Sequence, residues 1–247
     1  MPLRDEIASP AGKRRYVRRL FATIADRYDF ITVALSYGQD RRWKSRLVDL
    51  AGPRSGMRAL DLATGTGDIA FALAARGADV VGLDITLRMI ELAVAKIGRA
   101  SDHPADPAFP ARPAFVVGDM LALPFPSASF DLVTTGYGLR NVPDLTTAVD
   151  EIRRVLRPGG RLLSLDFNRP ANALLRQMYL AYLNVVGGTL GFALHGDPDT
   201  YRYIPASIRQ YPGAARVAGL MRERGFASAV HYPVLGGLMA IHDAVRD

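Results

Sequence analysis

The chain has 247 residues, of which 49% are hydrophobic, and a net charge of +7. This length and apolar content fit one α/β domain with a large core and exclude an intrinsically disordered chain. The absence of cysteine excludes disulfides, thiolate metal sites and a thiol nucleophile. The first residues contain no apolar signal segment, so we expect a cytoplasmic protein.

Basic residues gather near the start of the chain. They are Lys13, Arg14, Arg15, Arg18 and Arg19, followed by Arg41, Arg42, Lys44 and Arg46. Such a cluster suits nucleic acid, an anionic membrane or an acidic ligand, and an arginine-rich solvated surface is the alternative. An anionic membrane would attract it by roughly 1 kcal/mol for each nearby charge.

Two helices are predicted before the first strand, at residues 12–30 and 40–51, and they form a helical cap over residues 1–52. Strands and helices then alternate. The predicted strands are 58–62, 79–83, 114–117, 130–135 and 161–167, and the predicted helices are 67–76, 86–97 and 145–156. Thr86 is the expected side-chain cap of the second of these helices, and residues 99–113 read as a mobile loop. This alternation indicates a parallel sheet covered by helices.

The last third of the chain has a different pattern. Residues 178–194 carry no charge but are too few for a membrane-spanning helix, which needs about 20 apolar residues. A helix at 213–224 precedes two strands, 229–234 and 238–243, whose short connection requires a hairpin. We therefore predict an α/β fold with a mostly parallel, seven-stranded sheet and an antiparallel C-terminal hairpin, in which one edge strand is reversed.

A glycine turn, Gly65-Thr66-Gly67-Asp68-Ile69-Ala70, follows the first strand. It fits both the dinucleotide fingerprint and the glycine loop of S-adenosylmethionine (SAM) enzymes, and a purely structural turn is the third reading. Asp84 ends the next strand, where a carboxylate can accept hydrogen bonds from both ribose hydroxyls of either cofactor; its alternative role is to stabilise a helix N-terminus.

Two other carboxylates favour SAM. Asp61, just before the turn, would repel a pyrophosphate but attract the ammonium group of a methionine moiety. Asp119, followed by Met120 after the third strand, lies where an adenine amino group could donate to it; an ordinary loop carboxylate is the alternative.

The segment Gly136-Tyr137-Gly138-Leu139-Arg140-Asn141 follows the fourth strand. Because the carboxyl ends of parallel strands face the ligand crevice, Arg140 and Asn141 can orient a polar substrate or a water molecule. A surface salt bridge is the other role open to Arg140.

Several motifs together resemble the ubiquinone/menaquinone biosynthesis C-methyltransferase family over residues 20–243. They are Tyr28-Asp29-Phe30, Leu35-Ser36-Tyr37-Gly38, Arg42-Trp43-Lys44, Leu60–Asp68, Gly138-Leu139-Arg140-Asn141-Val142, Arg154–Arg161 and Tyr201-Arg202-Tyr203-Ile204. The resemblance implies one class I, Rossmann-like methyltransferase domain over residues 1–247, with an apolar lid at 171–208 over a prenylated quinol; a core helix is the alternative for the uncharged stretch.

The candidate site residues are inferred from the residue types and from the resemblance together. The expected cofactor positions are Asp61, Gly65, Thr66, Gly67, Asp84, Asp119, Met120 and Gly136, and the expected catalytic residues are Arg140, Asn141 and Tyr28. Arg140 is a poor base, because it is permanently cationic, but it can stabilise a phenolate or hold a relaying water with Asn141 and Tyr28. No metal is expected, and the scattered residues His195, His231 and His242 are interpreted as structural.

The chain departs from the family pattern near the substrate side. Ile31-Thr32 replace Met-Asn, Asp40 replaces a common histidine, Asp166 replaces a glutamate and Asn168 replaces a serine. These changes leave open whether the acceptor is a menaquinone or a ubiquinone precursor.

Other functions remain open from the sequence. They are methylation of another small apolar acceptor, a non-catalytic scaffold for quinone biosynthesis and a nicotinamide-dependent oxidoreductase. Nucleic acid is not an expected partner, because no Asn/Asp-Pro-Pro-Tyr type segment is present. Peripheral contact with the inner face of the cytoplasmic membrane and a homodimer are both compatible with the pattern.

Overall fold

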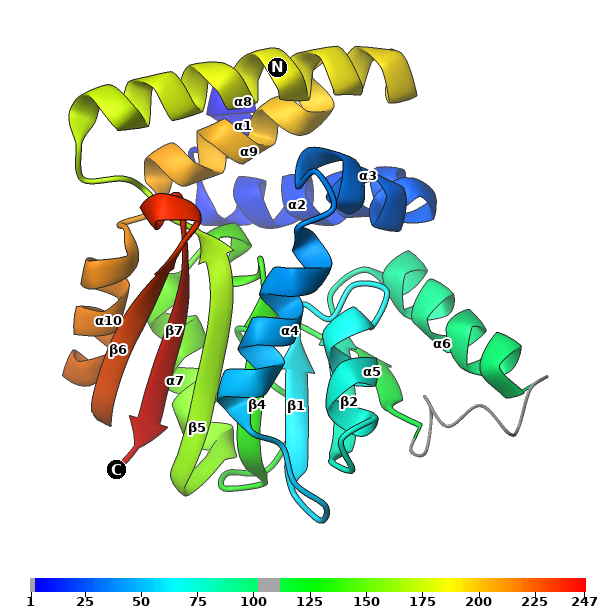
Figure 1. Ribbon diagram of the computed structural model, residues 1–247, viewed down its shortest axis with the longest axis vertical. Coiled ribbons are helices and arrows are strands. Elements are labelled where there is room, and N and C mark those ends of the chain that lie inside the picture. Colours follow the sequence, from blue (N-terminus) through cyan, green and yellow to red (C-terminus); the bar gives the residue numbers. More distant parts are fainter. Residues whose placement is uncertain (1–2, 102–111) are drawn as a thin grey trace.

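A seven-stranded sheet in the order β3-β2-β1-β4-β5-β7-β6 forms the centre of the protein (Figure 1). The structure, a computed structural model, describes residues 3–101 and 112–247. The strands are β1 (Arg58–Leu62), β2 (Asp79–Asp84), β3 (Ala114–Val117), β4 (Phe130–Gly136), β5 (Leu156–Phe167), β6 (Phe226–Val234) and β7 (Met239–Arg246). The predicted loop at 99–113 lies mostly outside the described residues; α6 (Leu87–Ser101) covers its first part.

The expected mostly parallel sheet with an antiparallel C-terminal hairpin is confirmed. The reversed strand is β7, however, and it lies between β5 and β6 rather than at the edge. The position of β6 at the edge fits its sequence, because Pro233 cannot donate a hydrogen bond to a neighbouring strand and is best tolerated in an edge strand. On the other side, β2 and β4 both pair with β1, so the strand order reverses there and a ligand crevice opens at the carboxyl ends.

Helices cover both faces of the sheet. On one face, Leu47 of α4 (Asp40–Ala51) and Leu73 of α5 (Asp68–Ala74) pack in one buried cluster. On the other face, Ile152 of α7 (Leu145–Val155) and Val217 of α10 (Ala214–Glu223) pack in a second cluster. Alternate strand residues supply the two clusters, as the period of a strand requires.

A layer of helices lies above the carboxyl ends of the parallel strands (Figure 1). It comprises α1 (Leu3–Glu6), α2 (Pro10–Ile24), η1 (Ala25–Arg27), α3 (Tyr28–Leu35), α8 (Ala173–His195) and α9 (Asp199–Gln210). Shorter 3₁₀ turns lie elsewhere, η2 (Leu139–Asn141) and η3 (Leu235–Gly237).

Two helix predictions need correction, and one helix was missed. The continuous helix expected at 12–30 is divided by η1, and α2 begins two residues earlier, where the Ser9 side chain accepts a hydrogen bond from the amide of Gly12. The helix α9 was not predicted. Thr86 precedes α6, but its buried hydroxyl makes no hydrogen bond with any described residue, so it is not the side-chain cap that its position indicates.

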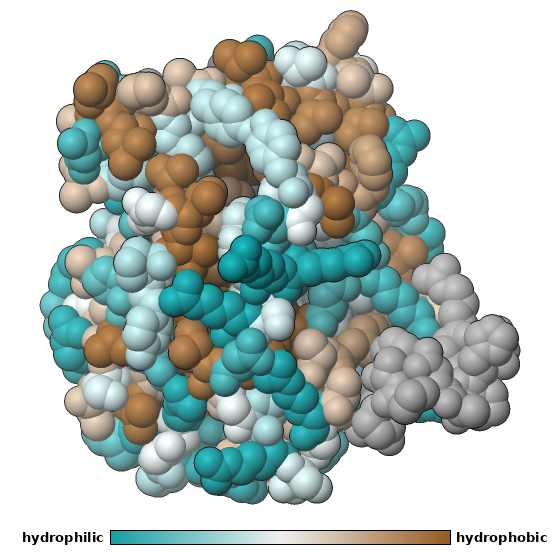
Figure 2. Space-filling view, viewed as in Figure 1, coloured by the Kyte–Doolittle hydropathy of each residue, from teal (hydrophilic) through white to brown (hydrophobic). Residues whose placement is uncertain are grey.

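The predicted lid at 171–208 is a pair of packed helices, α8 and α9. Glycines of α8 allow the close approach, because a Cβ at Gly191 would lie 2.6 Å from the carbonyl oxygen of Asp197. The opposite side of α8 exposes Met178, Val185 and Phe192, which are spaced seven residues apart and so share one side of the helix. Apolar side chains gather at the top of the space-filling view, where α8 lies (Figure 2). No helix in the described part of the chain is long and apolar enough to cross a membrane.

Replacing Gly191 by alanine should destabilise the pair α8–α9. The added methyl group forces the connection at Asp197 away, which costs about 1–3 kcal/mol. Hydrogen exchange should report faster exchange of amides in α8 and α9. The control is Gly219→Ala in α10, where the nearest atom to the added methyl group lies at 3.7 Å and stability should stay equal or rise by up to about 1 kcal/mol. Equal protection of α8 in both variants would contradict this packing argument.

Candidate active site

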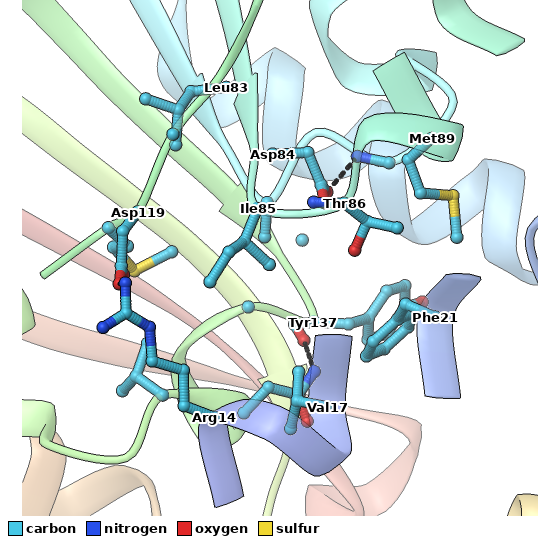
Figure 3. A pocket seen from close by; sticks show the side chains of 18 of the residues that line it. Arg14, Val17, Phe21, Leu83, Asp84, Ile85, Thr86, Met89, Asp119 and Tyr137 are labelled. Carbon is cyan, nitrogen blue, oxygen red and sulfur yellow. Dashed lines mark hydrogen bonds and ion pairs between the residues drawn. The ribbon is translucent and has the colours of Figure 1, made fainter. Parts of the chain in front are cut away.

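A cavity lies at the carboxyl ends of β1, β2, β3 and β4 (Figure 3). Its floor is formed by the loops that follow these strands. Its roof comes from the helix α2, through Arg14, Val17 and Phe21. The sequence prediction missed these three roof residues, and only the basic cluster around Arg14 drew attention to that helix.

The glycine turn after β1 forms one end of the cavity. Gly65 lines it and has φ +55°, a conformation that favours glycine. Gly67 is required for packing, because a Cβ there would lie 2.9 Å from the rings of Phe71 and Phe115. Thr66 and Gly67 do not line the cavity, so the turn presents mainly Gly65 to a ligand.

Asp84 lies in the middle of the cavity wall, with both carboxylate oxygens held by backbone amides. Oδ2 accepts from the amide of Gly65 at 2.9 Å, and Oδ1 accepts from the amide of Thr86 at 2.8 Å. Burial raises the pKa of Asp84, and these two hydrogen bonds act against that rise. Each oxygen can accept one more hydrogen bond, which suits a pair of neighbouring hydroxyls such as those of a ribose.

Thr86, which follows Asp84, lines the same wall. Leu83, Ile85 and Met120 add apolar side chains around it, and Gly136 lines the far side. The donor set therefore fits the nucleoside part of SAM: polar groups for the ribose and apolar walls for a flat ring.

Asp119 is in contact with the roof helix α2. Arg14 of α2 forms an ion pair with its Oδ2 at 2.6 Å, and its Oδ1 accepts from the amide of Leu121. Asp119, which we expect to accept a hydrogen bond from an adenine amino group, therefore also connects the roof helix with the floor of the cavity.

Asp61 lies behind the glycine turn and does not line the cavity. Its oxygens accept hydrogen bonds from the hydroxyls of Thr64 at 2.6 Å and Thr134 at 2.7 Å. Burial raises the pKa of Asp61 to about 6, against the effect of these two hydrogen bonds. Direct contact with a methionine ammonium group remains a prediction.

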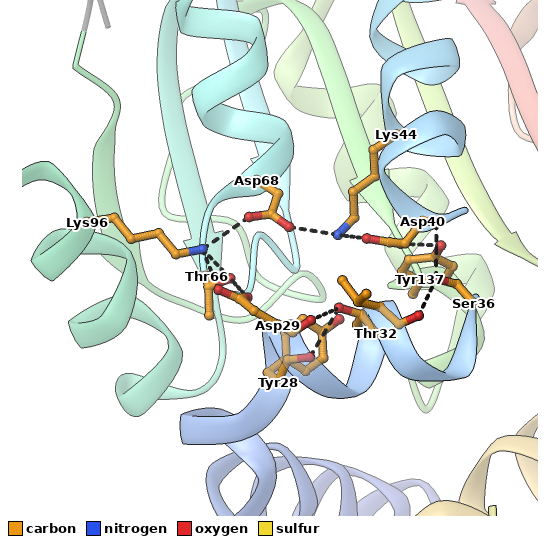
Figure 4. A network of polar contacts seen from close by, with 11 residues as sticks. Tyr28, Asp29, Thr32, Ser36, Asp40, Lys44, Thr66, Asp68, Lys96 and Tyr137 are labelled. Atoms are coloured by element: carbon orange, nitrogen blue, oxygen red, sulfur yellow. Dashed lines mark hydrogen bonds and ion pairs between the residues drawn. The ribbon is translucent and has the colours of Figure 1, made fainter. Parts of the chain in front are cut away.

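A chain of charged groups joins the glycine turn to the cap (Figure 4). Thr66 donates to Asp29 of α3 at 2.5 Å and accepts from Lys96 of α6 at 2.9 Å. Lys96 also pairs with Asp68, and Asp68 pairs with Lys44 of α4. Thr66 therefore fixes the turn against two other elements, α3 and α6.

The same chain continues to Asp40, one of the positions where the sequence departs from the family pattern. Asp40 is 2% exposed, pairs with Lys44 at 2.6 Å and accepts a hydrogen bond from the hydroxyl of Tyr137 at 2.7 Å. Burial lowers the pKa of Lys44, but its acidic neighbours outweigh this effect and raise the pKa above its ordinary value. Tyr137 lines the cavity with φ +61°, so this network holds a strained backbone position in place.

Of the expected catalytic residues, Asn141 and Tyr28 line the cavity, whereas Arg140 does not. Asn141 lines the cavity, and its amide group donates to the carbonyl of Tyr137 at 2.7 Å. Arg140 lies behind it, 5% exposed, and its Nη1 donates to the side chains of Asn141 at 3.1 Å and Ser207 at 2.7 Å. Its Nε pairs with Asp166 at 3.0 Å, so the surface salt bridge left open by the sequence is a buried one.

Tyr28 lines the cavity, with its ring beside Gly65. Burial raises the pKa of the Tyr28 hydroxyl to about 12. It therefore stays protonated at neutral pH and can donate a hydrogen bond, but it cannot serve there as a base.

The histidines have protein partners in the described part of the chain. His195 hydrogen bonds to the hydroxyl of Tyr201 at 2.9 Å, and His242 to the carbonyl of Ala214 at 3.0 Å. Burial lowers the pKa of His242 to about 4, so it is neutral at physiological pH. Among residues 3–101 and 112–247, no group of three or more acidic or histidine side chains could hold a metal ion.

Replacing Asp84 by alanine should weaken SAM binding. The loss of two hydrogen bonds to a buried carboxylate corresponds to a rise in Kd of about 10- to 100-fold. Titration calorimetry measures this, with Asp79→Ala, at the exposed start of the same strand, as the control that leaves Kd unchanged. An unchanged Kd in the Asp84 variant would exclude its predicted ribose role.

Comparisons with known proteins agree with this geometry. The structure is similar to a SAM-dependent methyltransferase from Thermotoga maritima, with a TM-score of 0.65 at 16% identity, covering 94% of this chain and 100% of the other. The sequence is 39% identical over 239 residues to the demethylmenaquinone methyltransferase of Roseiflexus castenholzii, covering 96% of both chains. It is 37% identical to the ubiquinone/menaquinone biosynthesis C-methyltransferase UbiE of Teredinibacter turnerae, covering 98% of this chain and 95% of that one. A profile of the ubiE/COQ5 methyltransferase family matches residues 10–246, and the chain therefore belongs to that family.

Proposed function

We propose that the protein transfers the methyl group of SAM to a ring carbon of a prenylated quinol, in menaquinone or ubiquinone biosynthesis. The observation that carries the proposal is the cavity at the carboxyl ends of β1, β2 and β4, which combines a nucleoside-binding wall with Asn141, backed by the buried Arg140. The names of the two relatives above support a quinol acceptor.

The predicted roles of the cofactor residues follow from the cavity. Gly65 and Asp84 would hold the methionine end and the ribose, with Asp61, Thr66 and Gly67 shaping the turn from behind. Leu83, Ile85 and Met120 would enclose the adenine, and Asp119 would receive its amino group where Arg14 now contacts it.

Methyl transfer from a sulfonium is an in-line displacement, so the protein mainly has to align donor and acceptor and exclude water. The roof helix α2 and the buried floor around Asn141 serve these purposes. Arg140 acts through Asn141: its guanidinium fixes the Asn141 amide, which faces the cavity. Arg140 is therefore a positioning residue in this proposal, and its positive charge also favours a developing phenolate nearby.

The prenyl tail suggests where the protein works. The exposed side of α8, with Met178, Val185 and Phe192, can lie in the interfacial region of a bilayer, and Arg176 on the same helix adds positive charge. We propose peripheral binding to the anionic inner face of the cytoplasmic membrane, where prenylated quinols reside.

Arg140→Lys should lower kcat at least tenfold and leave the Kd for SAM within twofold. Lysine keeps a positive charge beside Asp166 but loses the contacts to Asn141 and Ser207. Methylation is followed with tritiated SAM and a reduced short-chain demethylmenaquinone, and binding by calorimetry. Arg216→Lys, on the exposed side of α10, is the matched control.

Two outcomes of this assay count against the proposals. Equal losses in kcat and SAM affinity would refute the positioning role of Arg140. Absence of turnover by the wild-type protein, with either a naphthoquinol or a benzoquinol acceptor, would refute quinol methylation and favour a scaffold or a methyltransferase of another small apolar acceptor.

The double variant Val185→Ser, Phe192→Ser should bind vesicles of anionic phospholipid several-fold more weakly than wild type, because both side chains lie on the exposed side of α8. Co-sedimentation measures the bound fraction. Val94→Ser, Val230→Ser removes two exposed valines from α6 and β6 and should bind as wild type does. Equal binding of all three proteins would exclude α8 as the membrane contact.

A further inference from the structure

A second cavity, of about 660 Å³, lies beside the one described above. It is bounded by the start of α2, the residues of η2 and the segment after α9. Val142 and Pro143 line both cavities, so the two spaces adjoin. Arg140 faces the second cavity and its neighbour Asn141 faces the first.

The second cavity is lined by polar groups that are oriented by the fold. Lys13 of α2 reaches into it, and its Nζ donates to the carbonyl oxygen of Arg140 at 2.9 Å. Tyr211 also belongs to its lining. It is 4% exposed, and its side chain packs in the buried core cluster with Val217 and Met221.

We propose that this cavity binds the hydroxyl-bearing edge of the acceptor ring, with Lys13 taking the phenolic proton. The proposal rests on the proposed function and adds the proton acceptor to it. The cavity that contains Lys13 shares Val142 and Pro143 with the cavity where the methyl donor would lie, so the acceptor and the donor would occupy neighbouring spaces.

The electrostatics of the second cavity support this role. Burial lowers the pKa of Lys13 to about 8, the positive charge of Arg140 lowers it as well, and Asp166 of β5 acts in the opposite direction. A lysine with this pKa is partly neutral near pH 8 and is then able to accept a proton. Tyr211 is the other titratable group in the lining besides Arg140, and burial raises its pKa well above the ordinary value, so it stays protonated and does not compete with Lys13 as a base.

The reaction balances with these groups. The quinol O–H bond breaks and its proton moves to neutral Lys13, which leaves a phenolate whose ring carbon is nucleophilic. That carbon forms a bond to the methyl group as the methyl–sulfur bond breaks, giving a ring ketone and S-adenosylhomocysteine. The ring then loses the proton of the methylated carbon to water, and Lys13 returns its proton to the oxygen. One proton is released in total.

Lys13→Met and Lys13→Arg test the assignment together. Both lack a base of suitable pKa, so both should lower kcat at pH 7.5 by at least 100-fold, with the Kd for SAM unchanged within twofold. The rise of kcat/KM with pH near 8 should disappear in both. Arg18→Met removes one exposed positive charge from the same helix and should behave as wild type. A wild-type rate in Lys13→Arg, or a wild-type pH profile in Lys13→Met, would overturn the proposal.

A second measurement does not depend on turnover. Competitive acetylation by acetic anhydride, read by mass spectrometry across pH, gives the pKa of Lys13, and 2-naphthol is added as a stable phenol probe. We expect a pKa near 8 and protection of Lys13, but not of Lys96, by the probe. Turnover by the wild type without such protection overturns the assignment of Lys13. Protection without any quinol turnover overturns the proposed function and retains a phenol-binding cavity.

Discussion

The ion pair between Arg140 and Asp166 is the interaction on which the architecture of the site depends. Both side chains are almost completely buried, and such a pair is tolerable only when the remaining hydrogen-bonding groups are satisfied. Asp166 accepts from the amides of Arg140 and Phe167, and the Arg140 guanidinium stacks on the ring of Phe167. Burial raises the pKa of Asp166, and Arg140 opposes that rise.

This pair also connects the layers of the molecule. Asp166 belongs to β5 in the sheet, while Arg140 binds Ser207 of α9 and its carbonyl receives Lys13 of α2. One buried guanidinium group thus contacts the sheet and a helix of the cap at once, in addition to the ion pair of Arg14 with Asp119. Removing one partner leaves an uncompensated charge, which explains why the informative substitution at Arg140 is one that keeps the charge.

Much of the fold was predictable because its signals are local. The helix at 40–51 and the strands at 58–62 and 114–117 match the structure at both ends, since apolar periodicity and nearby turn residues define them. The helix α9 escaped prediction because Pro205 inside it is typical of a helix break, and because it packs against α8. The position of β7 between two strands depends on tertiary pairing that no local pattern encodes.

Some residues of the candidate site could likewise be predicted from the sequence, and others could not. Gly65, Asp84, Asp119, Met120 and Gly136 line the cofactor cavity because residues at the ends of parallel strands converge there, which topology alone predicts. The sequence could not place Asp61 behind the turn, since its two threonine partners come from different segments. Nor could it identify the roof, because α2 reaches the cavity only through the packing of the cap.

The roof helix has one further consequence. Consecutive residues of α2, Lys13 and Arg14, line two different cavities, one proposed for the acceptor and one beside Asp119. A shift of α2 that accommodates one ligand must therefore move a side chain in the site of the other. The two binding equilibria are then linked. If bound donor changes the affinity for the acceptor by some factor, bound acceptor changes the affinity for the donor by the same factor.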